Sequence, residues 1–380
     1  MRQRGQRVTE DRGLREPDLP RTARVRTGPL RSGWTTGTCS AAAAKAATTA
    51  LLTQQVQTHV DVVLPDERLV GFDVERCEVD EARSQAVVVK DAGDDPDVTH
   101  GAHLTATVSW LPEPGLQLEG GLGVGVVTKP GLGLEVGGPA INPVPRQMIR
   151  DNVGAAVDLR ARGLRVVLSV PDGERRARKT TNARLGILGG ISILGTTGVV
   201  RPFSTESWRA SVVQAVDVMA AQALPTLVLA TGGRTEKAAM RLLPELPDTC
   251  FVEVGDFTGA ALRQAADAGL RDVVFVGMAG KLTKLAGGVL MTHYTRSKVD
   301  LSVLAELSPA GLREQVAQAN TARHAYEMWE AAGVLRPCGD ALCARVADVL
   351  TRFSGLRARV AMVDPEGRGV VAATEPGWLS

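Results

Sequence analysis

Three short glycine-containing loops carry the residues of this sequence that are best suited to bind a nucleoside-type ligand. They are residues 231–235 (TGGRT), 255–259 (GDFTG) and 277–281 (GMAGK), and each follows a short apolar run. Glycine lets a backbone N–H reach a polar ligand, and an acid after the second strand is where a ribose hydroxyl is often held. The residues expected to bind such a cofactor are Gly232, Gly233, Asp256, Gly277 and Gly280.

None of these loops matches the dinucleotide pattern G-x-G-x-x-G or the phosphate-binding pattern G-x-x-x-x-G-K-[ST], so neither NAD nor ATP is indicated. Lys281 and Lys284 in GKLTKLAGG resemble an anion site, although a solvated helix face gives the same pattern. His293, in the polar stretch just beyond, can act as an acid or a base, and a packed or surface histidine is the alternative.

An acidic segment, VKDAGDDPDVTHG, holds further candidates for proton transfer. Asp94 and Asp95 lie in it, but acids grouped in this way are equally typical of turns capped by side-chain hydrogen bonds. His100 and His103 have too few partners nearby for a metal site, so we expect no metal ligands. Cys39 has no evident base beside it and is interpreted as a small packing residue.

The elements that must position these residues differ between the two halves of the chain. After Pro202, apolar strands alternate with helices, which predicts βαβ units and a Rossmann-like parallel sheet with ligands near the strand carboxyl ends. Before it, GWTTGTCSAAAAKAA predicts a loop followed by an alanine-rich helix, and β-branched runs over residues 60–110 predict a mixed or antiparallel sheet. The fold class is therefore α/β with an α+β portion.

A chain of 380 residues exceeds what one hydrophobic core usually organises, so two domains are expected. The predicted division is a flexible Arg-rich tail over 1–30, an α+β domain over 31–203, a Rossmann-like α/β domain over 204–335, and a C-terminal helix and β-hairpin over 336–380. The glycine-rich and proline-rich stretch from 123 to 149 is expected to be one long functional loop inside the first domain.

Composition excludes several classes of protein. A net charge of +2, with no interleaving of basic and aromatic residues, argues against a nucleic-acid partner. The five scattered cysteines favour a reducing compartment, and the sequence has neither a membrane-span pattern nor a signal-peptide pattern. We therefore expect a cytoplasmic protein without membrane contact.

Several of these stretches, taken together and in order, resemble one family. GWTTGTCSAAAAKAA, KDAGDDPDVTHG, GVVTKPGLGLEVGGPAINPVPRQMI, NARLGILGGISILGTTGVVRP, TGGRTEKA and VGMAGKLTKLAGG are similar to motifs of the cobalt-precorrin-5B C1-methyltransferases, the CbiD type. The resemblance covers roughly residues 31–300. It implies S-adenosylmethionine-dependent methylation of C-1 of cobalt-precorrin-5B to cobalt-precorrin-6A, on the anaerobic route to cobalamin, with a small cobalt-corrinoid as the partner.

The resemblance also suggests what the glycine-rich stretch does. A corrin precursor is a flat apolar macrocycle fringed with carboxylates, so Gly189, Gly190 and Gly195 can form thin backbone walls while polar side chains hold the fringe. A glycine-rich bend packed on a helix is the alternative. The expected substrate-binding residues are Thr35, Thr36, Thr38, Lys129, Asn182, Arg184, Gly189, Gly190, Thr196, Thr197, Lys281 and Lys284.

Methyl transfer depends mostly on alignment, and a base assists only if the ring has to lose a proton. The candidates for that base are Asp94, Asp95 and His293. Two other functions stay open on the residues alone, namely a tetrapyrrole carrier without activity and an enzyme that handles a phosphate or a nucleotide. A homo-oligomer is compatible with the sequence.

Overall fold

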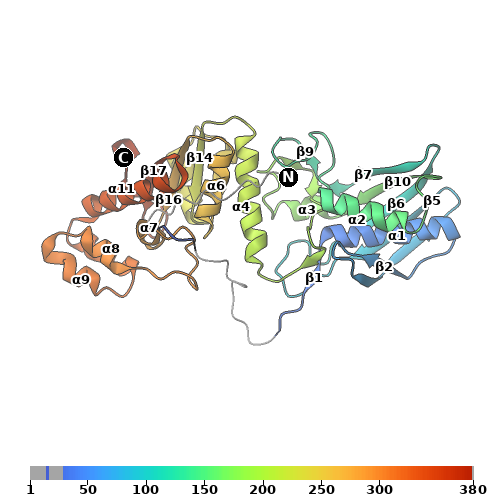
Figure 1. Cartoon of the computed structure of the whole chain (residues 1–380), viewed down its shortest axis with the longest axis horizontal. Helices are drawn as coiled ribbons and strands as arrows, with labels where there is room; N and C mark the ends of the chain where they lie inside the picture. Colours follow the sequence, from blue (N-terminus) through green and yellow to red (C-terminus); the bar gives the residue numbers. More distant parts are fainter. Residues whose placement is uncertain (1–13, 17–28, 379–380) are drawn as a thin grey trace, which may run out of the picture. The chain divides into compact units, whose positions relative to one another are not determined.

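The computed structural model describes residues 14–16 and 29–378 of the chain. Within these residues, the chain divides into two compact units (Figure 1). Unit 1 contains residues 14–16 and 205–378, and unit 2 contains residues 29–204. The division therefore falls after Ser204, whereas the sequence analysis placed it after residue 203.

Unit 2 is built on a mixed five-stranded sheet, in agreement with the sequence prediction. Its order is β4 (Arg76–Val79), β5 (Arg83–Val89), β6 (His103–Leu111), β10 (Gly163–Ser169) and β7 (Gly115–Gly120). All neighbours are antiparallel except β10 and β7, which run parallel. The loop between β5 and β6, which is the predicted acidic segment, therefore lies at one end of two interior strands of this sheet.

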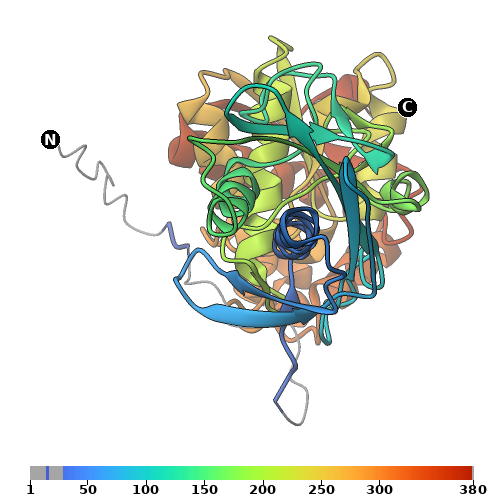
Figure 2. The same ribbon diagram turned by 90° about the vertical axis from the view of Figure 1, so that its right-hand side faces the viewer.

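The alanine-rich helix α1 (Thr36–Thr53) lies at the centre of this unit. It packs against β5, β6 and α2 (Pro143–Gly154), as the view along the helix in Figure 2 shows. Its alanines from Ala41 to Ala44 are fully buried. Because an alanine side chain ends at Cβ, the helix can approach its neighbours closely without losing helix propensity. The sheet, the two helices and a small hairpin, β2 (His59–Val63) with β3 (Leu69–Asp73), enclose the core of the unit.

The glycine-rich stretch that the sequence assigned to one long loop contains short strands instead. β8 (Gly123–Val124) pairs in parallel with β12 (Gly190–Ile191), and β9 (Val126–Val127) pairs antiparallel with β11 (Ile187–Leu188). The two glycine-rich stretches, residues 123–127 and 187–191, therefore pair with each other through backbone hydrogen bonds. Strands of two residues are too short to produce an alternating pattern, which is why the sequence prediction was wrong here.

Two further short elements complete unit 2. β1 (Gly33–Trp34) pairs antiparallel with β13 (Val199–Val200), and α3 (Gly173–Ala177) follows β10. The β1–β13 pair brings the start of α1 next to the end of the glycine-rich stretch.

Unit 1 contains the predicted parallel sheet, and the Rossmann-like prediction is confirmed. Its order is β15 (Phe251–Glu253), β14 (Thr226–Ala230), β16 (Asp272–Gly277), β17 (Arg357–Val363) and β18 (Val370–Ala373). The first four strands are parallel and β18 is antiparallel. From β14 the chain goes first to β15 on one side and then to β16 on the other. The carboxyl ends of β14 and β16 therefore form the topological switch point, where open α/β sheets bind ligands.

The helices of unit 1 connect and cover this sheet. They are α4 (Thr205–Ala220), α5 (Gly233–Leu242), α6 (Thr258–Asp267), α7 (Ala279–Ala286), α8 (Leu301–Glu306), α9 (Arg313–Ala317), α10 (Ala322–Ala331) and α11 (Leu335–Ser354), with short 3-10 turns η1 (Asp248–Cys250), η2 (Ala310–Leu312) and η3 (Pro376–Trp378). The sequence predicted the last helix and hairpin as a separate segment. Instead α11 packs on β17 and β18, and these strands extend the parallel sheet.

Part of the predicted N-terminal tail is attached to unit 1. The backbone N–H of Arg15 donates to Gly288 O (2.7 Å), Leu290 N–H donates to Arg15 O (2.8 Å), and Glu16 forms an ion pair with Arg263. Residues 1–13 and 17–28 of that tail lie outside the described residues. In the described part of the chain, no helix has both the length and the apolar character needed to span a membrane.

Candidate functional site

The three predicted cofactor loops meet at the carboxyl edge of the unit 1 sheet. Lys281 Nζ, at the start of α7, donates to Thr231 O (3.0 Å) after β14 and to Gly255 O (2.7 Å) after β15, and it lies 3.3 Å from Asp256 Oδ1. One ammonium group thus joins the loops of three strands. About a third of the Lys281 side chain and a quarter of the Asp256 side chain are exposed, so a ligand at this edge can reach both.

The glycines of these loops have different surroundings. A Cβ added at Gly233 or Gly280 would meet no atom within 4 Å, and at Gly232 only Glu253 Oε1 at 4.0 Å. Each of these three positions therefore faces open space. A Cβ at Gly277 would lie 3.0 Å from the Leu282 side chain, so this glycine serves packing, and the expectation that it contacts the cofactor is not supported by its placement.

A second layer of polar groups holds Asp256 and the end of α7 together. Thr292 Oγ1 donates to Asp256 Oδ1 (2.9 Å), and Lys284 Nζ donates to Thr292 O (2.8 Å). Burial lowers the pKa of Lys284 below its ordinary value, although the nearby Asp256 carboxylate opposes the shift. His293 follows in sequence, is 6% exposed, and its Nδ1 lies 2.8 Å from Thr295 Oγ1. The structure thus brings four predicted site residues into one region, namely Asp256, Lys281, Lys284 and His293. The sequence identified each of them within its own loop and did not show that the loops lie together.

Two residues at this edge were missed by the sequence analysis. Thr292 links Asp256 to Lys284, but nothing in the pattern distinguishes it from other threonines. Trp208, near the start of α4, is 51% exposed, and its ring approaches to 3.3 Å of the Cβ position of Gly255. Its helix precedes the sheet, so strand periodicity gave no reason to place it beside a loop that follows β15.

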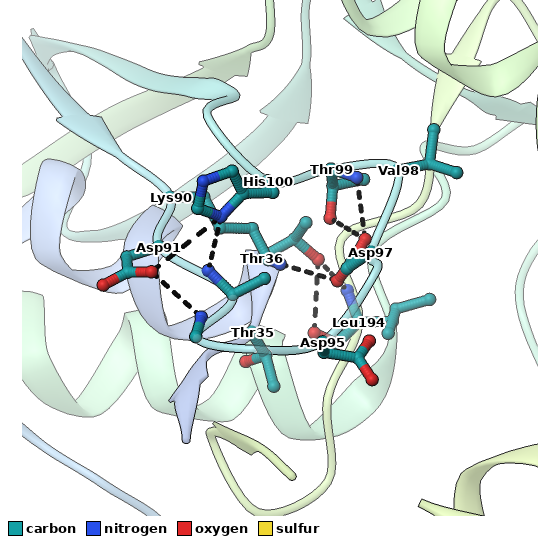
Figure 3. Close-up of polar contacts among 12 residues, drawn as sticks. Thr35, Thr36, Lys90, Asp91, Asp95, Asp97, Val98, Thr99, His100 and Leu194 are labelled. Carbon is teal, nitrogen blue, oxygen red and sulfur yellow. Dashed lines mark hydrogen bonds and ion pairs between the residues drawn. The ribbon is translucent and has the colours of Figure 1, made fainter. Parts of the chain in front are cut away.

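In unit 2 the sequence motifs meet around the first turn of α1 (Figure 3). The Thr35 side chain accepts from Thr38 N and caps the helix. Thr36 Oγ1 donates to Ser192 O (3.1 Å) and accepts from Leu194 N (2.9 Å). Thr38 Oγ1 donates to Gly198 O (2.7 Å). All three threonines were expected to bind substrate. In the structure their hydroxyls form hydrogen bonds within the protein, Thr35 with the first turn of α1, and Thr36 and Thr38 with the backbone of the glycine-rich stretch.

The acidic segment forms a folded loop whose carboxylates accept backbone N–H groups. Asp94 Oδ2 accepts from Arg31 N (2.7 Å), and Asp95 Oδ1 accepts from Phe203 N (2.8 Å). These two bonds join the loop to distant backbone groups, whereas Asp91 Oδ1 and Asp97 Oδ1 accept from the N–H groups two residues on, Gly93 (2.9 Å) and Thr99 (2.7 Å), as turn-capping aspartates do. The chain places Asp94 and Asp95 in unit 2 and His293 in unit 1, so the three proposed bases are not gathered within one unit.

A buried ion pair anchors the same loop. Lys90 Nζ, whose side chain is 1% exposed, lies 2.7 Å from Asp97 Oδ2. Burial alone would raise the pKa of Asp97, but the Lys90 ammonium and the Thr99 hydrogen bonds outweigh it and hold the pKa below its usual range. Nearby, burial raises the pKa of the Cys39 thiol to about 12, so Cys39 stays protonated at neutral pH, as expected of a packing residue.

The predicted glycine walls are only partly available to a ligand. A Cβ at Gly190 would lie 2.1 Å from Gly123 O, and one at Gly195 would lie 2.5 Å from the Thr35 side chain. These two glycines therefore allow close packing within the protein, which corrects the expectation that they line a substrate wall. Gly189, at φ +79°, has no atom within 4 Å of its Cβ position. Beside it, Leu188 is 50% exposed.

The remaining predicted substrate residues fall into two groups. Asn182 is buried and donates from Nδ2 to Gly190 O (3.1 Å), so it supports the fold. Thr196 and Thr197 are exposed, and Lys129 and Arg184 are half-buried side by side, with Lys129 Nζ 3.5 Å from Arg184 O. The exposed apolar residues Leu188 and Val126 form a directly opposed pair on β11 and β9, and Gly189 follows Leu188 between β11 and β12.

Two other features of unit 2 do not coincide with these motifs. A cavity of about 300 Å³ lined by Trp110 and Arg162 lies at the end of β6, opposite to the acidic loop, which precedes β6. His100 lies 3.8 Å from Asp91 and His103 lies 3.1 Å from Glu75, so the two histidines have different carboxylate partners. In the described ranges no three metal-ligating side chains are grouped.

The fold and the site define a two-unit α/β protein, with three glycine-containing loops joined by Lys281 at the sheet edge of one unit and a glycine-rich motif assembly in the other. The chain belongs to the CbiD family. The family model described as CbiD matches residues 23–202, and the model described as CbiD, C-terminal domain, matches residues 291–374.

Several relatives of this chain share one name. Relatives from Salinispora arenicola (66% identical, covering 95% of this chain and 97% of that protein) and Rubrobacter xylanophilus (62% identical, 98% of each) are both named cobalt-precorrin-5B C(1)-methyltransferase. A relative of the same name from Dechloromonas aromatica is 53% identical over 80% of each chain. A crystal structure of the cobalamin biosynthesis protein (cbiD) from Archaeoglobus fulgidus is 27% identical, covers 74% of this chain and 93% of that chain, and has a TM-score of 0.38.

Proposed function

We propose that this protein is a methyltransferase that uses S-adenosylmethionine to methylate C-1 of cobalt-precorrin-5B, giving cobalt-precorrin-6A in cobalamin biosynthesis. The observation that carries the proposal is near-full-length identity of 62–66% to proteins named for this reaction. At the site itself, support comes from the switch point between β14 and β16, where a nucleoside cofactor fits the rule for open α/β sheets.

The residues at the carboxyl edge of unit 1 fit such a methyl donor. Gly232, Gly233 and Gly280 leave open space for a ligand next to the backbone. Asp256 presents a partly exposed carboxylate that suits the ammonium of the donor's amino-acid group, and Lys281 holds this carboxylate and the loops after β14 and β15 in place. When bound, the donor supplies an electrophilic methyl group on a sulfonium.

For the corrinoid, unit 2 offers an apolar strip with polar groups near it. Leu188 and Val126 are half-exposed, and Gly189 leaves the backbone uncovered between the two glycine-rich ladders. We propose that the flat ring lies on this strip. Lys129 and Arg184 are the basic side chains proposed to receive its carboxylate fringe, and Thr196 and Thr197 are exposed donors.

Catalysis then consists mainly of alignment. The protein holds C-1 of the ring in line with the methyl–sulfur bond, and fixed geometry of this kind can supply an effective molarity of about 10⁵ M or more. Where the ring loses a proton, the proposed acceptors are the imidazole of His293 and the carboxylates of Asp94 and Asp95. The protein needs no metal of its own for this reaction, since cobalt is part of the substrate.

The proposal is tested by two measurements on the full chain. Calorimetric titration with S-adenosylhomocysteine should give micromolar binding, and Gly232→Val and Asp256→Ala should weaken it while circular dichroism stays unchanged. Incubation with cobalt-precorrin-5B and S-adenosylmethionine should then add one methyl group to the corrinoid, detected by mass spectrometry. A protein that binds the corrinoid tightly but transfers no methyl group and ignores S-adenosylhomocysteine would be a carrier, and the proposal would be wrong.

A further inference from the structure

Unit 1 contains a cavity of about 370 Å³ at the carboxyl ends of β16 and β17. Its walls come from Met278 and Gly280 after β16, Val363 at the end of β17, and the first turns of α10. This volume falls within the range of small-molecule sites, about 300–1,000 Å³. The cavity adjoins the switch point, but none of the sequence motifs indicated it, because α10 lies far along the chain from the strands.

Tyr326 of α10 lines this cavity with an unused hydrogen-bonding group. The residue is 4% exposed, and among residues 14–16 and 29–378 its hydroxyl makes no hydrogen bond, although it is not one of the fully buried polar atoms that lack a partner. The hydroxyl is therefore still accessible, and a tyrosine that lines a cavity in this way can offer a polar group to a ligand while its ring stays packed. Burial raises the pKa of Tyr326 to about 12, with smaller contributions from acidic neighbours, so the phenol is neutral and can both donate and accept.

Of the two arginines around the cavity, Arg323 is ion-paired and Arg234 donates to a backbone carbonyl. Arg234 donates to Pro365 O (3.0 Å), and Arg323 forms ion pairs with Glu327 (2.9 Å) and Glu366 (3.5 Å). Much of the remaining lining is apolar, including Met278, Val299, Ala322 and Val363. The cavity therefore suits a flat, uncharged ring with one polar edge better than it suits a carboxylate or an ammonium group.

We propose that this cavity holds the adenine of the methyl donor, with the Tyr326 hydroxyl hydrogen-bonded to a polar atom of the purine edge. The inference rests on the proposed function and deepens it, because it assigns the two ends of the donor. The adenine lies on the β16–β17 side of the edge. The charged amino-acid end is directed to the β14–β15 side, where Lys281 and Asp256 lie.

The first test removes only the hydroxyl. Tyr326→Phe should weaken binding of both S-adenosylhomocysteine and adenosine by the same factor, about fivefold to tenfold, because one hydrogen bond to the nucleoside is lost. Both ligands are titrated calorimetrically into the full chain. Since adenosine has no amino-acid end, an equal loss for the two ligands assigns Tyr326 to the nucleoside.

The second test fills the cavity. A Cβ at Gly280 meets no atom within 4 Å, so Gly280→Leu adds a side chain beside the cavity without a clash at Cβ. It should weaken adenosine binding about tenfold or more by occupying the purine site. Gly311→Leu is the matched control, because Gly311 in η2 is equally open and lies outside the cavity, and this variant should bind as the wild type does.

The outcomes separate this inference from the proposed function. If the wild type transfers methyl groups and binds S-adenosylhomocysteine while both Tyr326→Phe and Gly280→Leu bind as tightly, the adenine lies elsewhere and only this inference is overturned. If Tyr326→Phe weakens S-adenosylhomocysteine but leaves adenosine unchanged, the two ends are reversed. A wild type that binds neither ligand and methylates nothing overturns the proposed function, and the inference falls with it.

Discussion

Two groups of glycines, one in each unit, serve opposite purposes. In unit 1, Gly232, Gly233 and Gly280 leave space that no other part of the described protein fills. In unit 2, Gly190 and Gly195 are needed because the backbone of Gly123 and the side chain of Thr35 already occupy that space. A glycine-rich motif therefore indicates that something approaches the backbone, but the sequence alone does not say whether the approaching group is a ligand or the protein itself.

The largest expected contrast concerns the lysine–aspartate pair of each unit. Asp97→Asn should lower the free energy of unfolding by about 3–5 kcal/mol, because it leaves the buried Lys90 ammonium without its counter-charge. Asp256→Asn should cost less than about 1 kcal/mol, because Lys281 and Asp256 are partly exposed, yet it should weaken S-adenosylhomocysteine binding. Urea unfolding and calorimetry measure the two effects, and equal losses of stability would contradict the contrast.

The same pair gives unit 2 a pH dependence with a defined sign. Since the folded-state pKa of Asp97 is depressed, its contribution to stability is fully present above the unfolded pKa, about 3.9, and is lost as pH falls through the lower folded value. Between about pH 5 and pH 3, the unfolding free energy of the wild type should therefore fall more steeply than that of Asp97→Asn. Parallel pH profiles would show that the pair makes no such contribution.

A smaller contrast tests the glycines themselves. Gly190→Ala should destabilise the protein by about 1–3 kcal/mol, because its Cβ would lie 2.1 Å from Gly123 O. Gly233→Ala, in the first turn of α5, should leave stability unchanged or raise it by up to about 1 kcal/mol, because alanine is the better helix former. Thermal unfolding of both variants decides the point, and a stable Gly190→Ala protein would mean that the β8–β12 ladder can separate at little cost.

The smallest expected effect separates structural threonines from proposed substrate contacts within unit 2. Thr36→Val should cost about 1–3 kcal/mol, because buried hydrogen-bonding groups of Ser192 and Leu194 lose their partner. Thr196→Val, at an exposed position, should change stability by no more than about 0.5 kcal/mol and affect only corrinoid affinity. If Thr36→Val unfolds like the wild type but loses corrinoid affinity, the original assignment of Thr36 to the substrate is correct.

The fold class could be predicted because its signals are local. Strands of five or six residues alternating with helices gave the parallel sheet and the three loops that follow its strands. The addition of β17 and β18 to that sheet could not be predicted, because the pattern of a hairpin does not state which distant strand it joins. The two-residue strands β8, β9, β11 and β12 are too short for any periodicity.

The candidate site divides in the same way. Asp256 and Lys281 were predicted from their loops, and the rule for parallel sheets explains why those loops lie together. Tyr326 could not be predicted, because its relevance depends on a cavity that exists only where the start of α10 lies beside α7 and the carboxyl ends of β16 and β17. The threonines of α1 could not be assigned from the sequence, because a helix cap, an internal hydrogen bond and a ligand contact can all use the same residue type.

The attachment of Arg15 beside Val289 makes unit 2 an insertion within unit 1, since the chain begins one unit, completes the other and then returns. During synthesis, all of unit 2 is made before segment 288–290, so unit 2 can fold first. Residues 14–16 pair with segment 288–290 and therefore cannot do so until that segment has been synthesised. Closing so long a loop adds little to the entropic cost, which grows only with the logarithm of loop length. The delay, however, makes the docking of Arg15 a late event, which can occur only after segment 288–290 of unit 1 has been made.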